Sequence, residues 1–210
     1  MSSAGIACSG RIRAELYLSK GRAVSATGTT KKDGSKTERE PQDFYSTPAW
    51  CTELILPHLP PGGELLDPCC GKGAILSVVS PHYEAFGFEI DHDRAALCKR
   101  NGLLVLERDA FVEPWSDPHV ILTNPPFSLA EEFARKSLEK IHPSGTVAML
   151  LRLSMLAGKK RAALWREHPA DVYVLSQRPS FTRGGSDSCE YAWFVWGPGR
   201  GNRWFRLEKP

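Results

Sequence analysis

Short apolar runs alternate with stretches of helical pattern from Phe44 onward, and this alternation limits the fold more than any other feature of the sequence. The runs with the length and composition of strands are residues 63–69, 84–91, 103–111, 119–124, 145–153, 171–176 and 189–196. The stretches with helical patterns or capping signals are residues 48–59, 73–81, 92–102, 128–142 and 159–168. Thr47 is predicted to cap the first of these helices, with Pro48 as its first residue. The alternation predicts a layered α/β domain around a seven-stranded, mostly parallel sheet.

Residues 1–40 have a different composition, rich in Ser, Thr, Gly, Lys and Arg, and they predict a disordered basic tail before a domain at 41–210. Residues 14–20 are the one part of this tail with a short helical pattern. Lys and Arg outnumber Asp and Glu by 8 to 4 in the tail and by 11 to 5 in residues 152–210, whereas acids dominate by 15 to 8 between them. Basic segments on both sides of an acidic core suggest a polyanionic partner.

Several classes of protein are not indicated by the sequence. It has no apolar run of about 18 residues, so no transmembrane helix is expected. Its first residues contain no continuous apolar stretch, so we expect no secretion signal and a cytoplasmic location. The six cysteines form no C-x-x-C pair and no Cys/His cluster, and we therefore expect reduced thiols and no metal site.

Polar side chains stand at the ends of the first four predicted strands. Asp67 ends the first, Glu89 and Asp91 the second, Asp109 the third and Asn124 the fourth. In open α/β sheets, ligands bind beyond the carboxyl ends of the strands, so these side chains mark the expected site. The alternative for any one acid is a loop residue or a helix cap.

The loop after the first strand, DPCCGKG (67–73), is not a known phosphate-binding loop. A P-loop requires Gly five positions before Gly71, where Leu66 stands, and a dinucleotide fingerprint requires Gly where Leu76 stands. A nucleoside with a cationic sulfonium fits the acids better. Asp67 would favour its positive end, Glu89 the ribose hydroxyls and Asp109 an adenine amino group. That combination predicts S-adenosylmethionine.

The fourth strand ends abruptly in VILTNPPFS (120–128), because proline cannot continue a sheet ladder and disfavours a helical residue before it. The side-chain oxygen of Asn124 and the carbonyl of Pro125, held rigid by Pro126, can accept the two N–H groups of an amine. Those bonds favour a tetrahedral nitrogen with its lone pair free to attack a methyl group. Phe127 can stack on a flat substrate, so the motif suits catalysis by positioning and electrostatics. The alternative is an ordinary turn.

These motifs resemble those of the class I S-adenosylmethionine-dependent methyltransferases that modify amino nitrogens. DPCCGKG (67–73) is similar to their D-P-x-x-G-x-G loop, NPPF (124–127) matches their [DNS]-P-P-[YFW] tetrad, and FYSTP (44–48) is similar to the F-Y-T-P element of DNA adenine methyltransferases. Bacteriophage and prophage DNA N6-adenine methyltransferases resemble the chain most closely, which implies a bacterial or phage-infected cell.

The resemblance implies a Rossmann-like methyltransferase sheet with helices on both faces and S-adenosylmethionine as cofactor. The catalytic residues that it implies are Asn124, Pro125, Pro126 and Phe127. The cofactor-binding residues that it implies are Phe44, Tyr45, Thr47, Pro48, Asp67, Pro68, Cys69, Gly71, Gly73, Glu89, Ile90, Asp109, Ala110 and Asn124.

The resemblance implies that Asn rather than Ser as the first residue of the tetrad favours N6 of adenine over N4 of cytosine. An adenine must be flipped out of double-stranded DNA to be reached. No large target-recognition domain is visible, so base reading falls to the loops at 154–166 and 178–190. The candidate nucleic-acid contacts there are Lys159, Lys160, Arg161, Arg178 and Arg183. Methylation of RNA or of a protein glutamine amide remains open, as does a non-catalytic role.

Two features near the C-terminus admit more than one interpretation. Trp193 and Trp196 lie in the last predicted strand, where a place in the core is favoured over base stacking. The basic and aromatic segment 198–210 either contacts nucleic acid or packs on the sheet.

Overall fold

The computed structural model describes residues 46–181 and 189–209. Phe44, Tyr45, Arg183 and the tail predicted at 1–40, with its candidate helix at 14–20, lie outside the described residues. None of the helices in the described part of the chain is long and apolar enough to cross a membrane.

All strands of the described residues belong to one eight-stranded sheet with the order β3-β2-β1-β4-β5-β7-β6-β8. The strands are β1 (Glu64–Asp67), β2 (Glu84–Glu89), β3 (Leu104–Glu107), β4 (Val120–Thr123), β5 (Thr146–Arg152), β6 (Asp171–Leu175), β7 (Tyr191–Trp196) and β8 (Trp204–Leu207). Strand β7 runs antiparallel to β5 and β6, and the other neighbours are parallel. The mostly parallel α/β sheet is confirmed, with one more strand than the seven predicted.

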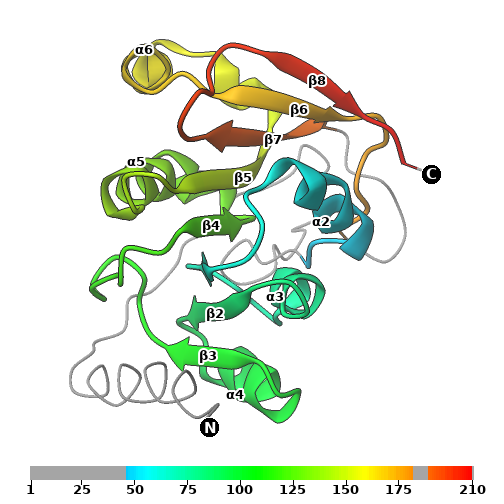
Figure 1. Ribbon diagram of the computed structural model, residues 1–210, viewed down its shortest axis with the longest axis vertical. Coiled ribbons are helices and arrows are strands. Elements are labelled where there is room, and N and C mark those ends of the chain that lie inside the picture. Colours follow the sequence, from blue (N-terminus) through cyan, green and yellow to red (C-terminus); the bar gives the residue numbers. More distant parts are fainter. Residues whose placement is uncertain (1–45, 182–188, 210) are drawn as a thin grey trace, which may run out of the picture.

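Helices cover both faces of the sheet, as predicted. They are α2 (Ala49–Ile55), α3 (Ala74–Val79), α4 (His92–Arg100), α5 (Ala130–Lys140) and α6 (Ala162–Glu167). Figure 1 shows α5 and α6 on one side of the sheet and α2, α3 and α4 on the other. Alternate residues of β5 enter two separate cores: Met149 packs on the side of α5, and Leu150 packs on the side of α2. A central strand buried on both faces explains its unbroken apolar sequence.

The first helix differs from its prediction at both ends. Pro48 occupies the N-cap position of α2 without a side-chain cap bond, so the prediction that Thr47 caps this helix is wrong. The α-helix stops at Ile55 and continues as a 3₁₀ helix, Leu56–His58, because Pro57 cannot supply the next backbone N–H. The indole of Trp193 donates to the carbonyl of Cys51 at 2.8 Å, which fixes α2 on the sheet and confirms a core position for this tryptophan.

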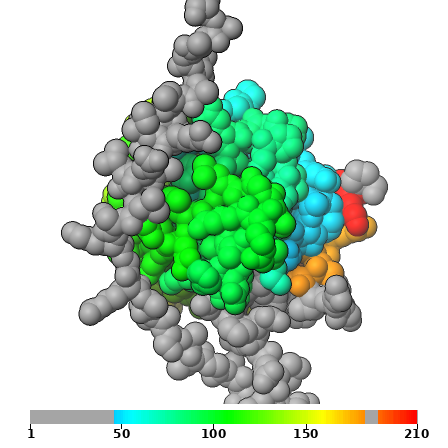
Figure 2. All heavy atoms as spheres, turned by 90° about the horizontal axis from the view of Figure 1, so that it is seen from below, coloured from blue at the N-terminus to red at the C-terminus, as the bar shows by residue number. Residues whose placement is uncertain are grey.

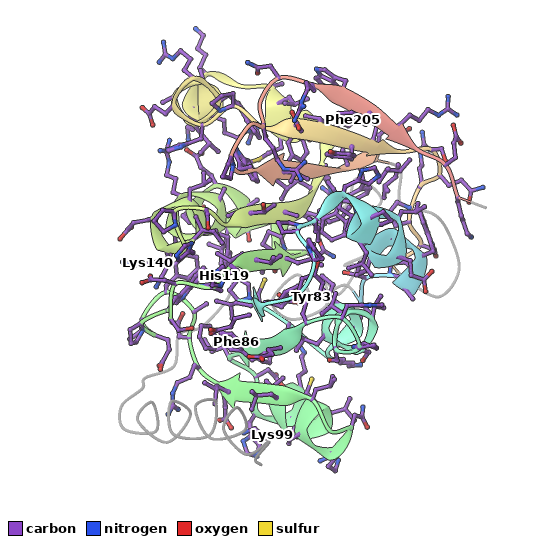
Figure 3. The ribbon with its side chains drawn as sticks, viewed as in Figure 1. Tyr83, Phe86, Lys99, His119, Lys140 and Phe205 are labelled. Atoms are coloured by element: carbon purple, nitrogen blue, oxygen red, sulfur yellow. The ribbon has the colours of Figure 1, made fainter. Side chains whose placement is uncertain are left out.

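The eighth strand comes from the segment 198–210, which therefore packs on the sheet, one of its two expected roles. Asp171 holds it in place: this buried carboxylate accepts from the backbone N–H of Gly201 at 2.9 Å and from the guanidinium of Arg203 at 3.0 Å. Burial opposes the charge of Asp171, but these donors outweigh it and lower the pKa of the carboxyl. Phe205, labelled in Figure 3, stacks on Tyr173 with ring centroids 4.4 Å apart.

The other edge strand is β3, which is shorter than predicted. It ends at Glu107 instead of 111, and the chain then turns, with the N–H of Arg108 donating to the carbonyl of Glu89 at 2.9 Å. The end of the molecule that carries β3 and α4 is the one seen in Figure 2. Strand β1 lies between β2 and β4, so the strand order reverses beside it. This reversal is the topological switch point at which open α/β sheets bind their ligands.

Candidate active site

The carboxylate of Asp67 lies at the end of β1 and is almost fully buried, with 1% of its surface exposed. It accepts from the hydroxyl of Thr123 at 2.7 Å and from the backbone N–H of Cys69 at 3.2 Å. Burial raises the pKa of Asp67 from 3.8 to about 7, against the lowering effect of these two bonds. Burial makes the charged form of this carboxyl unfavourable, yet the carboxyl lies at the switch point of the sheet. This combination indicates that its charge has a role in the site.

The loop that follows β1 is held close to the sheet. The N–H of Cys70 donates to the carbonyl of Phe88 at 2.9 Å, and Pro68 and Gly71 are buried. Gly73 has a φ of +78° at the N-cap of α3, and a Cβ there would lie 2.3 Å from Leu103 Cδ1. Gly73 thus gives the loop a left-handed backbone turn and packs closely against Leu103, as expected for a ligand-binding turn.

The cysteines in the described part of the chain are free thiols. Among the described residues Cys51, Cys70 and Cys98 are buried, and Cys69 and Cys189 are partly buried. The sulfur of Cys69 lies 2.9 Å from the hydroxyl oxygen of Thr123, which donates to Asp67. The thiol therefore joins the hydrogen bonds that hold Asp67, and its burial raises its pKa well above the ordinary value.

Glu89 ends β2 with 5% of its surface exposed, and it accepts from the N–H of Asp91 at 2.8 Å. Burial raises the pKa of Glu89, although that N–H and the charge of Arg94, 3.8 Å away, act in the opposite direction. Asp91 accepts from the N–H of Arg94 at 3.0 Å as the N-cap of α4, so its role is that of a helix cap. Ile90 is 38% exposed between the two acids, where it can contact a ligand.

The turn after β3 carries Asp109 and Ala110. Asp109 is partly exposed and accepts from the N–H of Phe111 at 2.8 Å. Ala110 is buried, and its carbonyl accepts from the indole of Trp115 at 2.9 Å. Asp109 shapes its own turn, and a carboxylate has further lone pairs with which to accept from a ligand.

Asn124 follows β4 directly, on the strand next to Asp67. Its side-chain amide donates from Nδ2 to the hydroxyl of Thr47 at 3.0 Å. Its Oδ1 is buried and has no hydrogen-bond partner among the described residues. A buried acceptor without a partner costs about 1–3 kcal/mol, so its retention at a strand tip points to a donor that arrives with a ligand.

The rest of the tetrad forms a tight turn. Pro125 is buried, and the carbonyl of Pro126 accepts from the N–H of Leu129 at 2.9 Å, within a short 3₁₀ helix, Phe127–Leu129. The ring of Phe127 is partly buried, with the guanidinium carbon of Arg152 4.1 Å from its centroid.

The predicted nucleic-acid contacts fall into different environments. Lys159 and Lys160 are exposed on a short 3₁₀ helix, Lys159–Arg161. Arg161 donates from Nε to the carbonyl of Ala157 at 3.0 Å and so shapes its own loop. Arg178 donates from Nε to Glu190 at 2.8 Å, and this pairing offsets its charge.

Three residues of the site did not emerge from the sequence. Thr123 contacts Asp67, Arg152 covers the ring of Phe127, and Tyr191 accepts a hydrogen bond from Arg152. Only Thr123 gave a signal, as a polar residue at the end of a fully buried strand.

The polar groups and glycines of the site suit an adenosine-type ligand with a cationic end. It offers two buried carboxylates, Asp67 and Glu89, and two loop glycines with positive φ, Gly71 and Gly73. It also offers the oxygen of Asn124, which has no partner within residues 46–181 and 189–209. In the described residues, no three His, Cys, Asp or Glu side chains gather as a metal ion would require.

Comparisons with known proteins agree with this geometry at the level of the fold. No family model and no curated protein matches the sequence. A putative RNA methyltransferase from Pyrococcus horikoshii has a similar structure, with a TM-score of 0.58 and 15% identity, over 90% of this chain and 96% of that one. A putative class I S-adenosylmethionine-dependent methyltransferase from Listeria monocytogenes matches with a TM-score of 0.57 and 12% identity, over 76% of this chain.

This chain has the Rossmann-like fold of class I methyltransferases. A third similar structure is a dimethyladenosine transferase from Plasmodium falciparum, with a TM-score of 0.56 and 15% identity over 73% of this chain. The match spans 62% of the Listeria protein and 62% of the Plasmodium protein, which is less than two thirds of either.

Proposed function

We propose that this protein transfers a methyl group from S-adenosylmethionine to the exocyclic N6 amine of adenine in DNA. The observation that carries the proposal is the buried Oδ1 of Asn124, which lacks a hydrogen-bond partner in the described part of the chain, beside the buried carboxyl of Asp67 on the adjacent strand. The first group suits an amine that approaches with its N–H groups, and the second suits a positively charged cofactor.

S-adenosylmethionine, when bound, supplies a methyl group activated by its sulfonium charge. Asp67 would hold its positive end, Glu89 its ribose hydroxyls and Asp109 the amino group of its adenine, with Ile90 and Ala110 beside the ring. The loop residues Pro68, Cys69, Gly71 and Gly73, together with Phe44, Tyr45, Thr47 and Pro48, complete the proposed cofactor site. The raised pKa of Asp67 fits this role, because a cation on the carboxylate would replace the solvation that burial removes.

Asn124 and Pro125 would handle the amine of the substrate. The side-chain oxygen of Asn124 and the carbonyl of Pro125 accept one N–H each, which leaves the nitrogen lone pair free to attack. Phe127 would stack on the flat ring and, with Pro126, fix its plane. Such hydrogen bonds lower the barrier by positioning the nitrogen and stabilising the charge that develops on it.

DNA binding would use positive charge around this site. Lys159 and Lys160 are exposed and would contact phosphates, and Arg161, Arg178 and Arg183 belong to the same predicted set. The pairing of Arg178 with Glu190 makes it the weakest candidate of those in the described residues. The basic tail at 1–40, before the proposed domain at 41–210, would add attraction that does not depend on sequence. These contacts would offset the few kcal/mol that flipping the base out of the duplex costs.

RNA is the second candidate substrate. Two of the similar structures are a dimethyladenosine transferase and a putative RNA methyltransferase, and their identities to this chain of 15% indicate a shared fold only. The FYSTP and NPPF motifs (44–48 and 124–127) favour DNA adenine, and a glutamine amide of a protein ranks third. A single experiment can distinguish the two substrates, because the methylated adenine is found either in the DNA or in the RNA of the cell.

The experiment is nucleoside mass spectrometry of DNA and RNA from cells that express the protein and lack their own adenine methylase. The matched control is Asn124→Ala, which removes the acceptor without touching Asp67. We expect N6-methyladenine in the DNA, and none with the variant. Methyladenine confined to RNA would transfer the proposal to RNA, and wild-type levels with Asn124→Ala would overturn the mechanism. Binding of S-adenosylmethionine within a few-fold of wild type would show that the variant keeps its cofactor site.

A further inference from the structure

The guanidinium of Arg152 lies over the aromatic ring of Phe127. Its central carbon is 4.1 Å from the ring centroid, within the roughly 6 Å at which a cation attracts an aromatic ring. Phe127 is the residue of the proposed active site that would stack on the target base. A guanidinium is planar and stacks on aromatic faces, as a base does, so a base on this face would need the space that Arg152 fills.

Arg152 is held over the ring by the neighbouring strand. It is the last residue of β5, directly opposite Tyr191 of β7, and its Nε donates to the hydroxyl of Tyr191 at 3.1 Å. Tyr191 is 1% exposed, so the anchor lies in the packed interior. Further interactions of Arg152 add to these two contacts, so the feature that matters at the site is the place of its guanidinium and not an unpaired charge.

The pocket beside this pair of side chains is small. Its volume is about 150 Å³, and Phe127 and Arg152 are two of its walls. The other walls are Ala130, Leu151, Ser154, Met155 and Arg161. Sites for small molecules enclose roughly 300–1,000 Å³, so the pocket is smaller than a ligand site while Arg152 lies in this position. Movement of the guanidinium away from Phe127 would enlarge the pocket and uncover the ring.

We propose that Arg152 occupies the place of the target base in the ligand-free protein and swings aside when the base stacks on Phe127. The inference rests on the proposed function, because it takes the target base to lie on that ring. Binding of the base then includes the loss of one cation–π contact, and the apparent affinity is lowered by the fraction of molecules in which the ring is covered. A nucleotide without a base has nothing to stack and does not compete with Arg152.

The test compares two oligonucleotides, one with the mapped target adenine and one with an abasic nucleotide in its place. Fluorescence anisotropy gives both Kd values, with S-adenosylhomocysteine in place of the cofactor so that no methyl group is transferred. The ratio of the abasic Kd to the adenine Kd isolates the contribution of the base, because contacts to the backbone and to other bases cancel. Arg152→Met removes the competing guanidinium and should raise this ratio about threefold, the worth of one cation–π contact.

The matched control is Arg166→Met, which removes an exposed arginine of α6 that does not line the pocket and should leave the ratio unchanged. Tyr191→Phe removes the hydroxyl that anchors Arg152 and keeps the ring, so it should raise the ratio by a smaller factor. This variant carries the test if melting temperature or affinity for S-adenosylmethionine shows that Arg152→Met is not folded.

The sign of the change separates a placeholder from an ordinary ligand of the substrate. If Arg152 stayed in place or bound the base directly, its loss would leave the ratio unchanged or lower it. Either result would overturn the inference while methylation by the wild-type protein persists. Failure of the wild-type protein to methylate any nucleic acid would instead overturn the proposed function.

Discussion

The side-chain amide of Asn124 donates to the hydroxyl of Thr47 at 3.0 Å, across 77 positions of the sequence. The bond joins the segment before α2 to the tip of β4, and it uses the N–H side of the amide. The oxygen side is thereby left as the acceptor at the site, where it has no partner among the described residues. In this orientation Thr47 holds the amide so that its oxygen faces the site.

Replacement of this hydroxyl by a methyl group tests the relationship. Thr47→Val removes the acceptor at nearly constant volume, so the amide of Asn124 can rotate and lose its productive orientation. We expect kcat to fall about tenfold, in line with the loss of one buried hydrogen bond. Thr47→Ser keeps the oxygen and should stay close to wild type. Steady-state kinetics on the nucleic-acid substrate provide the measurement, and equal kcat values for Thr47→Val and wild type would contradict the orienting role.

The buried carboxyl of Asp67 predicts how the stability of the ligand-free protein changes with pH. Its pKa is about 7 in the folded chain and near 3.8 in the unfolded chain, so the folded state binds more protons between these values. The free energy of unfolding therefore falls as pH rises through this window, by up to about 1.4 kcal/mol per pH unit. Asp67→Asn keeps an acceptor for Thr123 and cannot ionise. It should melt at a higher temperature than wild type near pH 8, with the difference shrinking toward pH 4.

Thermal unfolding followed by circular dichroism at both pH values checks this prediction without any ligand. A gap in melting temperature that is the same near pH 4 and near pH 8 would show that ionisation of Asp67 carries no such penalty. The comparison does not depend on the proposed function, because it concerns only the empty protein.

The same carboxyl predicts a pH dependence of cofactor binding. A positively charged ligand pairs with the ionised form of Asp67, so binding of S-adenosylmethionine should release one proton below the pKa of this carboxyl. Affinity should therefore rise between about pH 5.5 and about pH 7, by roughly tenfold per pH unit. Asp67→Asn should bind weakly and with little change over this range. Titration calorimetry gives both affinities, and a wild-type affinity that is constant over the range would argue against direct pairing at Asp67.

The fold was largely predictable from the sequence, and so were the strand ends on which the candidate site is built, because both depend on local patterns. Apolar runs gave the strands, and their ends gave Asp67, Glu89 and Asn124, since parallel strands bring their carboxyl ends to one edge. Asp91 shows the limit of this reasoning: it also follows a strand, but its side chain caps α4. When the loop between a strand and the next helix is short, an acid in it follows the strand and precedes the helix at once. The sequence pattern then does not distinguish a ligand-binding acid from a helix cap.

The contacts that complete the site were not predictable, because each joins residues far apart in the chain. Thr47 has the sequence signature of a helix cap, yet it serves Asn124. Arg152 is an ordinary strand-end residue until β7 places Tyr191 beside it. Strand β8 depends on a buried carboxylate, Asp171, that meets Arg203 only after the chain has folded back on the sheet. Such partners follow from topology, and local periodicity does not contain them.

Gly73, in the proposed cofactor loop, and Gly102, after α4, allow backbone strain to be separated from crowding. Their φ angles are +78° and +79°, but a Cβ on Gly73 would lie 2.3 Å from Leu103 Cδ1, and one on Gly102 would meet nothing within 4 Å. Gly102→Ala should cost about 1–2 kcal/mol of stability from the left-handed backbone and leave affinity for S-adenosylmethionine unchanged. Gly73→Ala adds the clash, so it should be more destabilising and weaken that affinity. Denaturant unfolding and calorimetry measure both, and equal losses for the two variants would mean that Leu103 moves aside freely.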